Sequence, residues 1–416
     1  MKFKKRMMSY LLMAALTVAS FWAAPIQAQA APAKGIDVAV YQGAIDWNAV
    51  KNAGYSFAFV KIGSGKSGLD PYFGANMVGA NAASLKVGAY VYSYSTTVEG
   101  ILQEALFAIA ALEPYTVSYP VVLDLEEAAH KNQTPAQLAA LITTFCETVK
   151  SAGYYPMVYT NKNMLETKIG ATPYDVWVAQ YADACTWPNP AFWQFTSNGM
   201  VPGIAGRVDL NYQFKDYSNL IVANGFVDRN GKRYYYKNYR MQFGFIQDGG
   251  RTYFMNADGS MYQNGWIGDG VNMFYMDTKD GHMLHDLVAI QGKNYYFDAN
   301  GLMQRGLVPI DGRIYLFGAD GSMQYGWYAD AAGMRYFAED GAMVANTTLT
   351  LDGVEYAFDA NGIATVVPQV PDINPLAWVI DPVTGITVDS TTGQVVDPVI
   401  VEQVLETARQ MAAQGK

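Results

Sequence analysis

The fold can be inferred from one stretch of the sequence, Tyr119-Pro120-Val121-Val122-Leu123-Asp124-Leu125-Glu126. An apolar run leads into one acid, and a second acid follows two positions later. Residues i and i+2 of a strand share a face, so Asp124 and Glu126 are expected to point the same way at the C-terminal end of a strand. Enzymes with a β/α barrel carry their catalytic groups at that end of their strands.

The sequence on either side of this stretch alternates apolar strands with helical patterns. The other expected strands are Gly35–Tyr41, Phe57–Gly63, Val87–Tyr94, Tyr154–Thr160, Asp175–Tyr181, Phe192–Thr196 and Val208–Phe214. Helices are expected at Asp46–Ala53, Tyr72–Ser84, Glu99–Leu112 and Pro135–Ser151. This alternation predicts an α/β fold, a β/α barrel of about eight strands. The later strands follow one another with little helix between them, so we expect the barrel to be irregular.

Two more of the expected strands carry an acid among apolar neighbours, Asp37 and Asp209. A carboxylate on a core strand is costly unless it has partners. Four converging carboxylates would be poor for stability but would suit a glycosidase, because crowded like charges raise the pKa of one acid and keep it protonated as a proton donor. The alternative is four unrelated strand-end acids, each capped by backbone N–H groups.

Aromatic and amide side chains gather at the same strand ends, together with one lysine. Rings stack on sugar faces and amides bond hydroxyls, so these residues are candidates for substrate binding; for many of them the alternative is ordinary barrel filling, and for the lysine a surface ion pair. The candidates are Lys61, Tyr90, Tyr92, Tyr159, Trp177, Gln180, Tyr181 and Gln194.

Residues 223–367 repeat with a step of about 20 residues. Gly244, Gly265, Gly306 and Gly326 each precede a large apolar residue. Each unit then has a turn, an aromatic strand and a second turn of the Asp-Gly or Asn-Gly type, which is a strong hairpin signal. One hairpin is barely stable alone, so we expect an all-β solenoid in which stacked hairpins bury a continuous aromatic seam.

The composition and the two ends of the chain narrow the function. The chain has 416 residues, a formal charge of −9 and three His, which argues against a nucleic-acid partner and leaves little for metal clusters. Residues 1–30 combine a basic start, an apolar run and a small-x-small site, as a secretory signal peptide does. Residues 368–416 are expected to form a Pro/Val/Asp-rich linker and a short helix. Whether Cys146 and Cys185 pair is left open.

Motifs along residues 34–216 resemble the glycoside hydrolase family 25 lysozymes, also called Chalaropsis-type muramidases. They are Gly35-Ile36-Asp37-Val38, Tyr41-Gln42-Gly43, Ile45-Asp46-Trp47, Phe57-Ala58-Phe59-Val60-Lys61, Asp124-Leu125-Glu126, Phe192-Trp193-Gln194 and Val208-Asp209-Leu210-Asn211. The resemblance implies a flattened barrel at residues 31–222 that cleaves the β-1,4 bond between N-acetylmuramic acid and N-acetylglucosamine in peptidoglycan glycan strands. It also implies that Glu126 is the general acid/base, that Asp124 orients the 2-acetamido group, and that Asp37 and Asp209 support the charge network.

The repeats resemble the cell-wall-binding, choline-binding-like hairpins attached to many such enzymes. In choline binders, rings of neighbouring hairpins form a cation–π cage. The candidate wall-binding residues are Trp266, Trp327, Tyr275 and Tyr296. Only Trp266 and Trp327 place a tryptophan directly after the repeat glycine, so wall binding is favoured but choline as the ligand is not. The alternative is that the repeats are a purely structural spacer.

Together these patterns predict a secreted, wall-associated muramidase that retains anomeric configuration, with no cofactor, no metal and no membrane partner once the signal peptide is removed. The attack on the sugar is expected from a nearby carboxylate or from the sugar's own acetamide. The competing interpretation is a catalytically idle wall-binding surface protein. An amidase or peptidase is disfavoured because no zinc or Cys–His set is recognisable.

Overall fold

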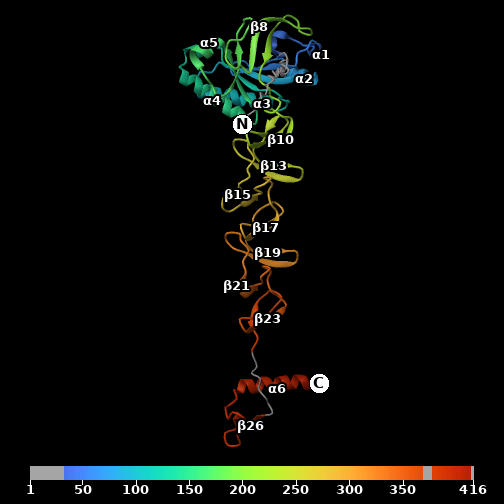
Figure 1. Ribbon diagram of the computed structural model, residues 1–416, viewed down its shortest axis with the longest axis vertical. Coiled ribbons are helices and arrows are strands. Elements are labelled where there is room, and N and C mark those ends of the chain that lie inside the picture. The colour runs from blue at the N-terminus through green and yellow to red at the C-terminus, as the bar shows by residue number, and fades with distance from the viewer. Residues whose placement is uncertain (1–31, 369–376, 414–416) are drawn as a thin grey trace, which may run out of the picture. The chain divides into compact units, whose positions relative to one another are not determined.

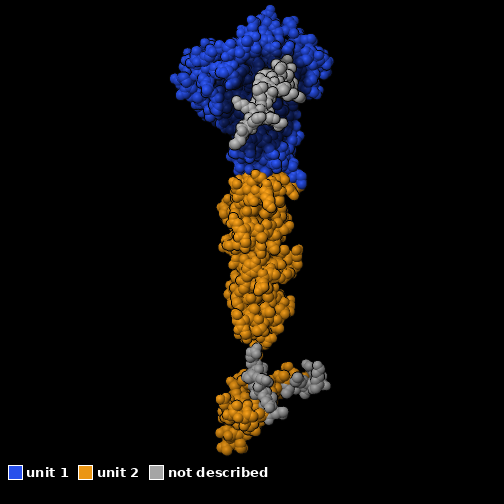
Figure 2. All heavy atoms as spheres, in the orientation of Figure 1, with its two compact units in different colours: residues 1–249, 254–261 blue, residues 250–253, 262–416 orange. Residues whose placement is uncertain are grey.

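The computed structural model describes residues 32–368 and 377–413. They fall into two compact units, one with the described residues up to Gly249 together with Phe254–Met261, and the other with Gly250–Tyr253 and the described residues from Tyr262 onward (Figure 2). The expected signal peptide at residues 1–30 lies outside the described residues.

The first unit contains the predicted barrel (Figure 1). Its strands follow the order β1-β9-β8-β7-β6-β5-β4-β2, and pairing of β1 with β2 closes the sheet. The pairings among β1, β2, β4, β5, β6, β7 and β8 are parallel, whereas β9 runs antiparallel to both of its neighbours, which confirms the irregular barrel. The strands are β1 Ala33–Val38, β2 Phe57–Ser64, β4 Lys86–Tyr92, β5 Val121–Asp124, β6 Pro156–Asn161, β7 Asp175–Ala179, β8 Phe192–Met200 and β9 Arg207–Gln213, with a short β3 at Gly68–Leu69.

The helices begin where the sequence supplies caps. Asp46, Thr97 and Thr134 each accept a hydrogen bond from a backbone N–H in the first turn of the helix that follows. Thr134 and Gln137 complete a capping box. The helices are α1 Trp47–Asn52, α2 Phe73–Ala82, α3 Val98–Leu112, α4 Pro135–Ser151 and the short α5 Lys162–Met164.

The barrel strands separate two hydrophobic cores, because successive side chains of a strand point to opposite faces. On β2, Phe57 and Phe59 point inward, where Phe59 stacks on Trp177 with ring centroids 4.5 Å apart. Ala58 and Val60 point outward into the core beneath the helices. The large inner rings fill the barrel and provide a rigid floor for the polar groups at its C-terminal end.

Strand β5 is shorter than the sequence pattern suggested. It ends at Asp124, and Leu125 still donates its N–H to the carbonyl oxygen of Tyr159 over 2.9 Å. The hydroxyl of Thr160 donates to the carbonyl oxygen of Leu125 at 2.6 Å. Glu126 therefore lies just past the strand, half-buried, while Asp124 remains in it and is buried.

Short antiparallel hairpins follow the barrel, as the repeat pattern predicted. Their turns use left-handed backbone, as at Asp311 with φ 49° and Gly312 with φ 77°. The strands are β10 Asn224–Arg229, β11 Lys232–Lys237, β12 Arg240–Met241, β13 Gly244–Asp248, β14 Arg251–Met255, β15 Gly265–Gly268, β16 Met273–Met276, β17 Asp286–Ile290, β18 Lys293–Phe297, β19 Gly306–Ile310, β20 Arg313–Phe317, β21 Gly326–Asp330, β22 Gly333–Phe337, β23 Thr347–Leu351, β24 Val354–Phe358 and β25 Ala364–Val366.

The C-terminal stretch differs in part from the expected linker and helix. A further hairpin pairs β26 Trp378–Ile380 with β27 Thr387–Asp389, and Asp381 and Asp389 each accept backbone N–H groups in the turn that follows them. Helix α6 then spans Pro398–Ala413, as predicted. None of the helices in the described parts of the chain is long and apolar enough to cross a membrane.

Candidate active site

Asp37 and Asp209 face each other across β1 and β9, where they are direct register partners. Asp37 is only 6% exposed. Its carboxylate accepts hydrogen bonds from the side-chain amides of Asn211, at 2.7 Å, and Gln194, at 3.1 and 3.2 Å to its two oxygens. The two carboxyl groups stand opposite each other in the sheet, and like charges in such a pair disfavour the ionisation of both.

Burial raises the pKa of both carboxyl groups of this pair. For Asp37 the nearby charge of Asp209 raises the pKa further, while the amides of Asn211 and Gln194 oppose the rise. For Asp209 burial is the largest cause. The pair therefore retains a proton at a pH where an isolated aspartate would have lost it.

Asp124 and Glu126 lie beside this pair. Burial, then the charge of Glu126, raises the pKa of Asp124, and Lys61 opposes the rise. Burial, then the charge of Asp209, raises the pKa of Glu126, and Lys61 again opposes it. Glu126 thus has a carboxyl group that holds its proton more tightly than usual, which general acid catalysis requires. The four predicted acids form one electrostatic cluster, since each of them either raises the pKa of another or has its own pKa raised by another.

The Oδ1 atom of Asp124 is buried and has no hydrogen-bond partner among the described residues. A buried acceptor left without a donor is costly and rare. The atom lies at the end of β5, next to the other acids.

Four tyrosines predicted to bind substrate surround the acids. Tyr92 lies next to Asp124 in the sheet register, donates its hydroxyl to Glu127 at 3.2 Å and has the Lys61 ammonium 4.9 Å from its ring centroid. Tyr159 and Tyr181 both donate their hydroxyls to the side-chain oxygen of Gln194, at 2.9 and 3.0 Å. Burial raises the pKa of Tyr181 to about 12 and also raises that of Tyr90. These phenols therefore stay neutral donors.

Tyr181 is the ring of this group most open to solvent, at 59% exposure. Trp177 is 1% exposed and lies in the barrel core, where its indole N–H donates to Asn211 at 2.8 Å. Trp177 therefore supports Asp37 indirectly, through Asn211, and presents no face to solvent.

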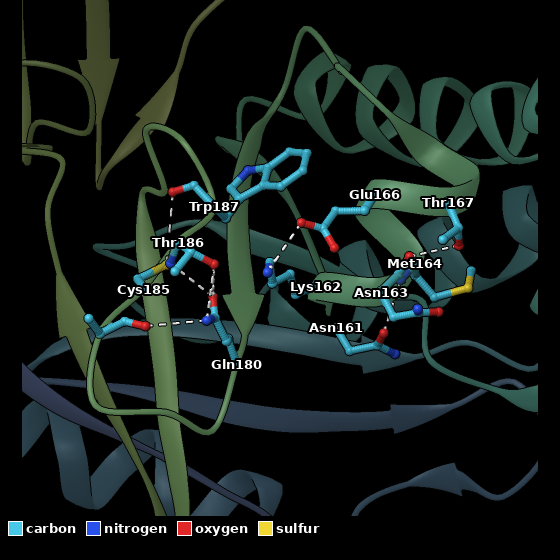
Figure 3. Close-up of polar contacts among 11 residues, drawn as sticks. Asn161, Lys162, Asn163, Met164, Glu166, Thr167, Gln180, Cys185, Thr186 and Trp187 are labelled. Atoms are coloured by element: carbon cyan, nitrogen blue, oxygen red, sulfur yellow. Dashed lines mark hydrogen bonds and ion pairs between the residues drawn. The ribbon is translucent and has the colours of Figure 1, made fainter.

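The amide of Gln180 is engaged with its own loop (Figure 3). It donates to the carbonyl oxygen of Ala184 and the hydroxyl of Thr186, and it accepts the N–H of Thr186 at 3.0 Å. The backbone carbonyl of Gln180 accepts the indole N–H of Trp193 at 2.7 Å. Gln180 thus fixes the β7–β8 loop that carries Tyr181.

Two residues of this site were not among the sequence-based candidates. Asn211 is fully buried and holds Asp37, and Glu127 holds Tyr92. The signal for Asn211 was present, because it lies two positions after Asp209 on one strand and therefore shares its face. Glu127 gave no such signal, since it follows the end of β5 in irregular structure.

The repeats contain two equivalent aromatic groups, which we call the tryptophan triads. In one, Trp266 contacts Tyr275 and Tyr295, each with ring centroids 5.0 Å apart. In the other, Trp327 contacts Tyr336 at 5.1 Å and Tyr356 at 4.8 Å. Each triad combines a cross-strand Trp–Tyr pair with a tyrosine of the next hairpin. Tyr296, which the sequence suggested, instead pairs with Leu287 and lies near Phe317.

Within the described ranges, one group of acids and histidine could hold a metal ion, Asp277, Asp280 and His282, whose ligand atoms lie within 4.8 Å of one another. These side chains already bind groups of the protein: Asp280 accepts from Arg251 and lies against His282, and Asp277 accepts two backbone N–H groups of its turn. This group shapes a repeat turn. Cys146 and Cys185 are both free thiols.

Acids with raised pKa values that gather at the end of a barrel where its parallel strands finish are an arrangement typical of glycoside hydrolases. Residues 36–204 match the family described as glycosyl hydrolases family 25. YegX of Escherichia coli K12 is 32% identical over 191 residues, which cover 42% of this chain and 68% of YegX. Lysozyme M1 of Streptomyces globisporus is 31% identical, covering 43% of this chain and 66% of that protein. The chain belongs to glycosyl hydrolases family 25.

The repeats also match two families of repeats. Residues 304–348 match a choline-binding repeat, and residues 244–261 and 287–303 match a putative cell wall binding repeat. Among solved structures, the modular autolysin LytC from Streptococcus pneumoniae is 28% identical with a TM-score of 0.40, covering 44% of this chain and 46% of LytC. A family 25 glycosyl hydrolase from Bacillus anthracis is 26% identical with a TM-score of 0.39, covering 45% and 90%.

Proposed function

We propose that this protein is a secreted muramidase that cleaves the β-1,4 bond between N-acetylmuramic acid and N-acetylglucosamine and is held on the cell wall by its repeats. The observation that carries the proposal is the pairing of a half-buried Glu126, whose pKa is raised, with the unpartnered Oδ1 of Asp124. The matched lysozymes are named for this class of reaction.

In the first step, protonated Glu126 gives its proton to the glycosidic oxygen as the bond to C1 breaks. The sugar's own acetamide oxygen attacks C1, and Asp124 accepts the acetamide N–H at its Oδ1. We favour this route over direct attack by a carboxylate because Asp124 has a vacant acceptor at the site. Water then attacks C1 from the other face, with Glu126 as the base, so the anomeric configuration is retained.

Asp37 and Asp209 act on the electrostatics of this step. The charge of Asp209 raises the pKa values of both Asp37 and Glu126. The tyrosine hydroxyls around them remain neutral, and their oxygens can accept hydrogen bonds from sugar hydroxyls. In this arrangement a negative field next to Glu126 favours its protonated form before reaction, and it stabilises the positive charge that develops at C1.

We propose that the tryptophan triads bind a wall polymer, through choline or through another component of the wall. Their support is the aromatic surface that Trp327, 37% exposed, presents next to Tyr336 and Tyr356. Two sites on one array raise the residence time on a polymer by avidity.

We also propose that the chain is exported, because residues 1–30 have the pattern of a secretory signal peptide. N-terminal sequencing of the protein from culture medium should begin at Ala31.

The test of the reaction is mass spectrometry of borohydride-reduced fragments released from purified peptidoglycan. Wild type should create reduced muramic acid ends, and Glu126→Gln should release about 10²-fold to 10⁴-fold less while keeping its circular dichroism spectrum. Reduced glucosamine ends would indicate cleavage of the other glycosidic bond, and released amino groups an amidase. Equal turnover by Glu126→Gln would reject the assignment, and no fragments from either form would favour an idle wall-binding protein.

A further inference from the structure

The first unit contains a pocket at the end of the barrel opposite the acids. It lies where β6 and β7 begin, at Pro156 and Asp175, whereas Asp124 ends β5 on the other side. Its volume is about 460 Å³. Its lining residues come from the barrel on one side and, on the other, from the hairpin β10–β11 and the residues that follow it. We call it the tyrosine pocket, because its lining includes Tyr154, Tyr155, Tyr174, Tyr234, Tyr236 and Tyr239.

The two walls are fixed to each other by hydrogen bonds. Met241 donates its N–H to the carbonyl oxygen of Gly153 at 2.9 Å, and the Arg240 guanidinium donates twice to that of Ala152. Arg240 also lies over the ring of Tyr154, 4.9 Å from its centroid. Gly153 is required there, because its φ is +88° and a Cβ would lie 2.4 Å from the Met241 oxygen. The tyrosine pocket is therefore a preformed cavity.

The charges around the pocket argue against an ionic ligand. The Arg229 guanidinium lies 4.3 Å from the ring centroid of Tyr234 and 5.5 Å from that of Tyr236, so a positive charge is already present beside these rings and disfavours a ligand cation. Asp175, Asp258 and Glu147 line the same cavity and disfavour an anion. Each of these three is already paired, with Lys215, Lys232 and Lys150 respectively.

What remains suits a neutral, polyhydroxylated molecule. Tyrosine rings are flat and apolar with a polar edge, and they bind at low cost in conformational entropy. The charged side chains supply donors and acceptors around them, and the volume lies in the range of small-molecule sites. A short neutral saccharide fits both properties.

We propose that the tyrosine pocket is a second saccharide-binding site, which takes a short neutral saccharide of about two sugar units. It extends the proposed function, since wall glycan is the polymer that this chain would meet, but it does not depend on the catalytic acids. A glycan strand held there would keep the barrel on the wall between cleavage events.

The test is a ligand-observed NMR titration of the full chain carrying Glu126→Gln, with chitobiose as the ligand. Added Tyr234→Ala removes a ring from the hairpin wall, and added Tyr174→Ala removes one from the barrel wall. Each should weaken the pocket's binding at least tenfold and leave any binding in the catalytic cleft. The matched control is Tyr235→Ala, on the same strand but with its ring against Phe226, and it should bind as the parent does.

The outcomes separate this site from the catalytic function. Two variants, one on each wall, keep the test valid if one of them fails to fold, as judged by circular dichroism. Unchanged chitobiose affinity in a folded Tyr234→Ala or Tyr174→Ala variant would overturn the proposal while leaving the muramidase function intact. Binding in the tyrosine pocket together with no glycan cleavage by wild type would support this site and reject the muramidase function.

Discussion

The side-chain amide of Asn211 donates a 2.7 Å hydrogen bond to Asp37. Its orientation is settled by Trp177, whose indole N–H can only donate and therefore takes the amide oxygen of Asn211. The nitrogen of Asn211 must then face Asp37. A donor that is fixed in this way holds the Asp37 carboxylate in place and lowers its pKa against the effect of burial.

We therefore expect Asn211 to be a positioning residue. Asn211→Ala should lower kcat on peptidoglycan about tenfold or more with little change in KM, because it acts on the acids and not on the substrate. It should also cost about 1–3 kcal/mol of stability, since Trp177 and Asp37 lose buried partners. Asn198→Ala, an exposed position on the neighbouring strand, is the control. A fall in stability with no change in kcat would make the role of Asn211 purely structural.

The main acids could be predicted because their signal is local. An apolar strand that ends in Asp-x-Glu needs no knowledge of the rest of the chain. Tyr296 shows the limit of such a pattern: neighbouring residues of a strand point to opposite faces, so a one-residue choice decides which tyrosine joins Trp266. The structure places Tyr295 there.

Other features depend on contacts between distant segments, which no local pattern contains. Glu127 becomes part of the site only because Tyr92 ends the strand next to β5. The docking of Met241 on Gly153 likewise joins a hairpin to a helix–strand turn far away in the sequence. Repeat spacing predicts hairpins, but it cannot predict what the first of them packs against.

The second prediction concerns the pH dependence of activity. Lys61 lowers the pKa of both Glu126 and Asp124. Without this charge both pKa values rise, so Glu126 stays protonated to higher pH and Asp124 ionises at higher pH. Lys61→Met should therefore move both limbs of the kcat/KM profile toward higher pH. Lys66→Met is the matched control, because the Lys66 ammonium lies over Tyr94. A profile that moves to lower pH would contradict the electrostatic role of Lys61.

The third prediction concerns stability. Because burial raises the pKa of Asp37, the native state binds its proton more tightly than the unfolded state does. The stability that this proton linkage provides is complete at low pH and is lost as pH rises through the folded-state pKa. Asp37→Asn keeps an acceptor for Asn211 and supplies a permanent donor to Asp209. At neutral pH it should raise the free energy of unfolding of the barrel by about 0.5–2 kcal/mol while abolishing most activity.

Urea unfolding at several pH values checks this prediction. The gain from Asp37→Asn should shrink toward zero as the pH approaches 3, where wild-type Asp37 is itself protonated. A variant that is less stable than wild type at neutral pH would show that the charge of Asp37 is well compensated in the native state. In that case the four acids would not be a strained cluster.

The fourth prediction concerns the tryptophan triads, studied in the Glu126→Gln chain so that the wall stays intact. Trp327→Ala removes the ring that contacts Tyr336 and Tyr356, and it should weaken binding to purified cell walls about fivefold. Leu307→Ala is the matched control, because Leu307 fills the same slot of another hairpin opposite Leu316 and not opposite a tyrosine. Adding Trp266→Ala to Trp327→Ala should weaken binding by more than either change alone, since two linked sites bind with avidity. If the double variant co-sediments with walls as the parent does, the triads are hairpin packing and the wall contact lies elsewhere on the chain.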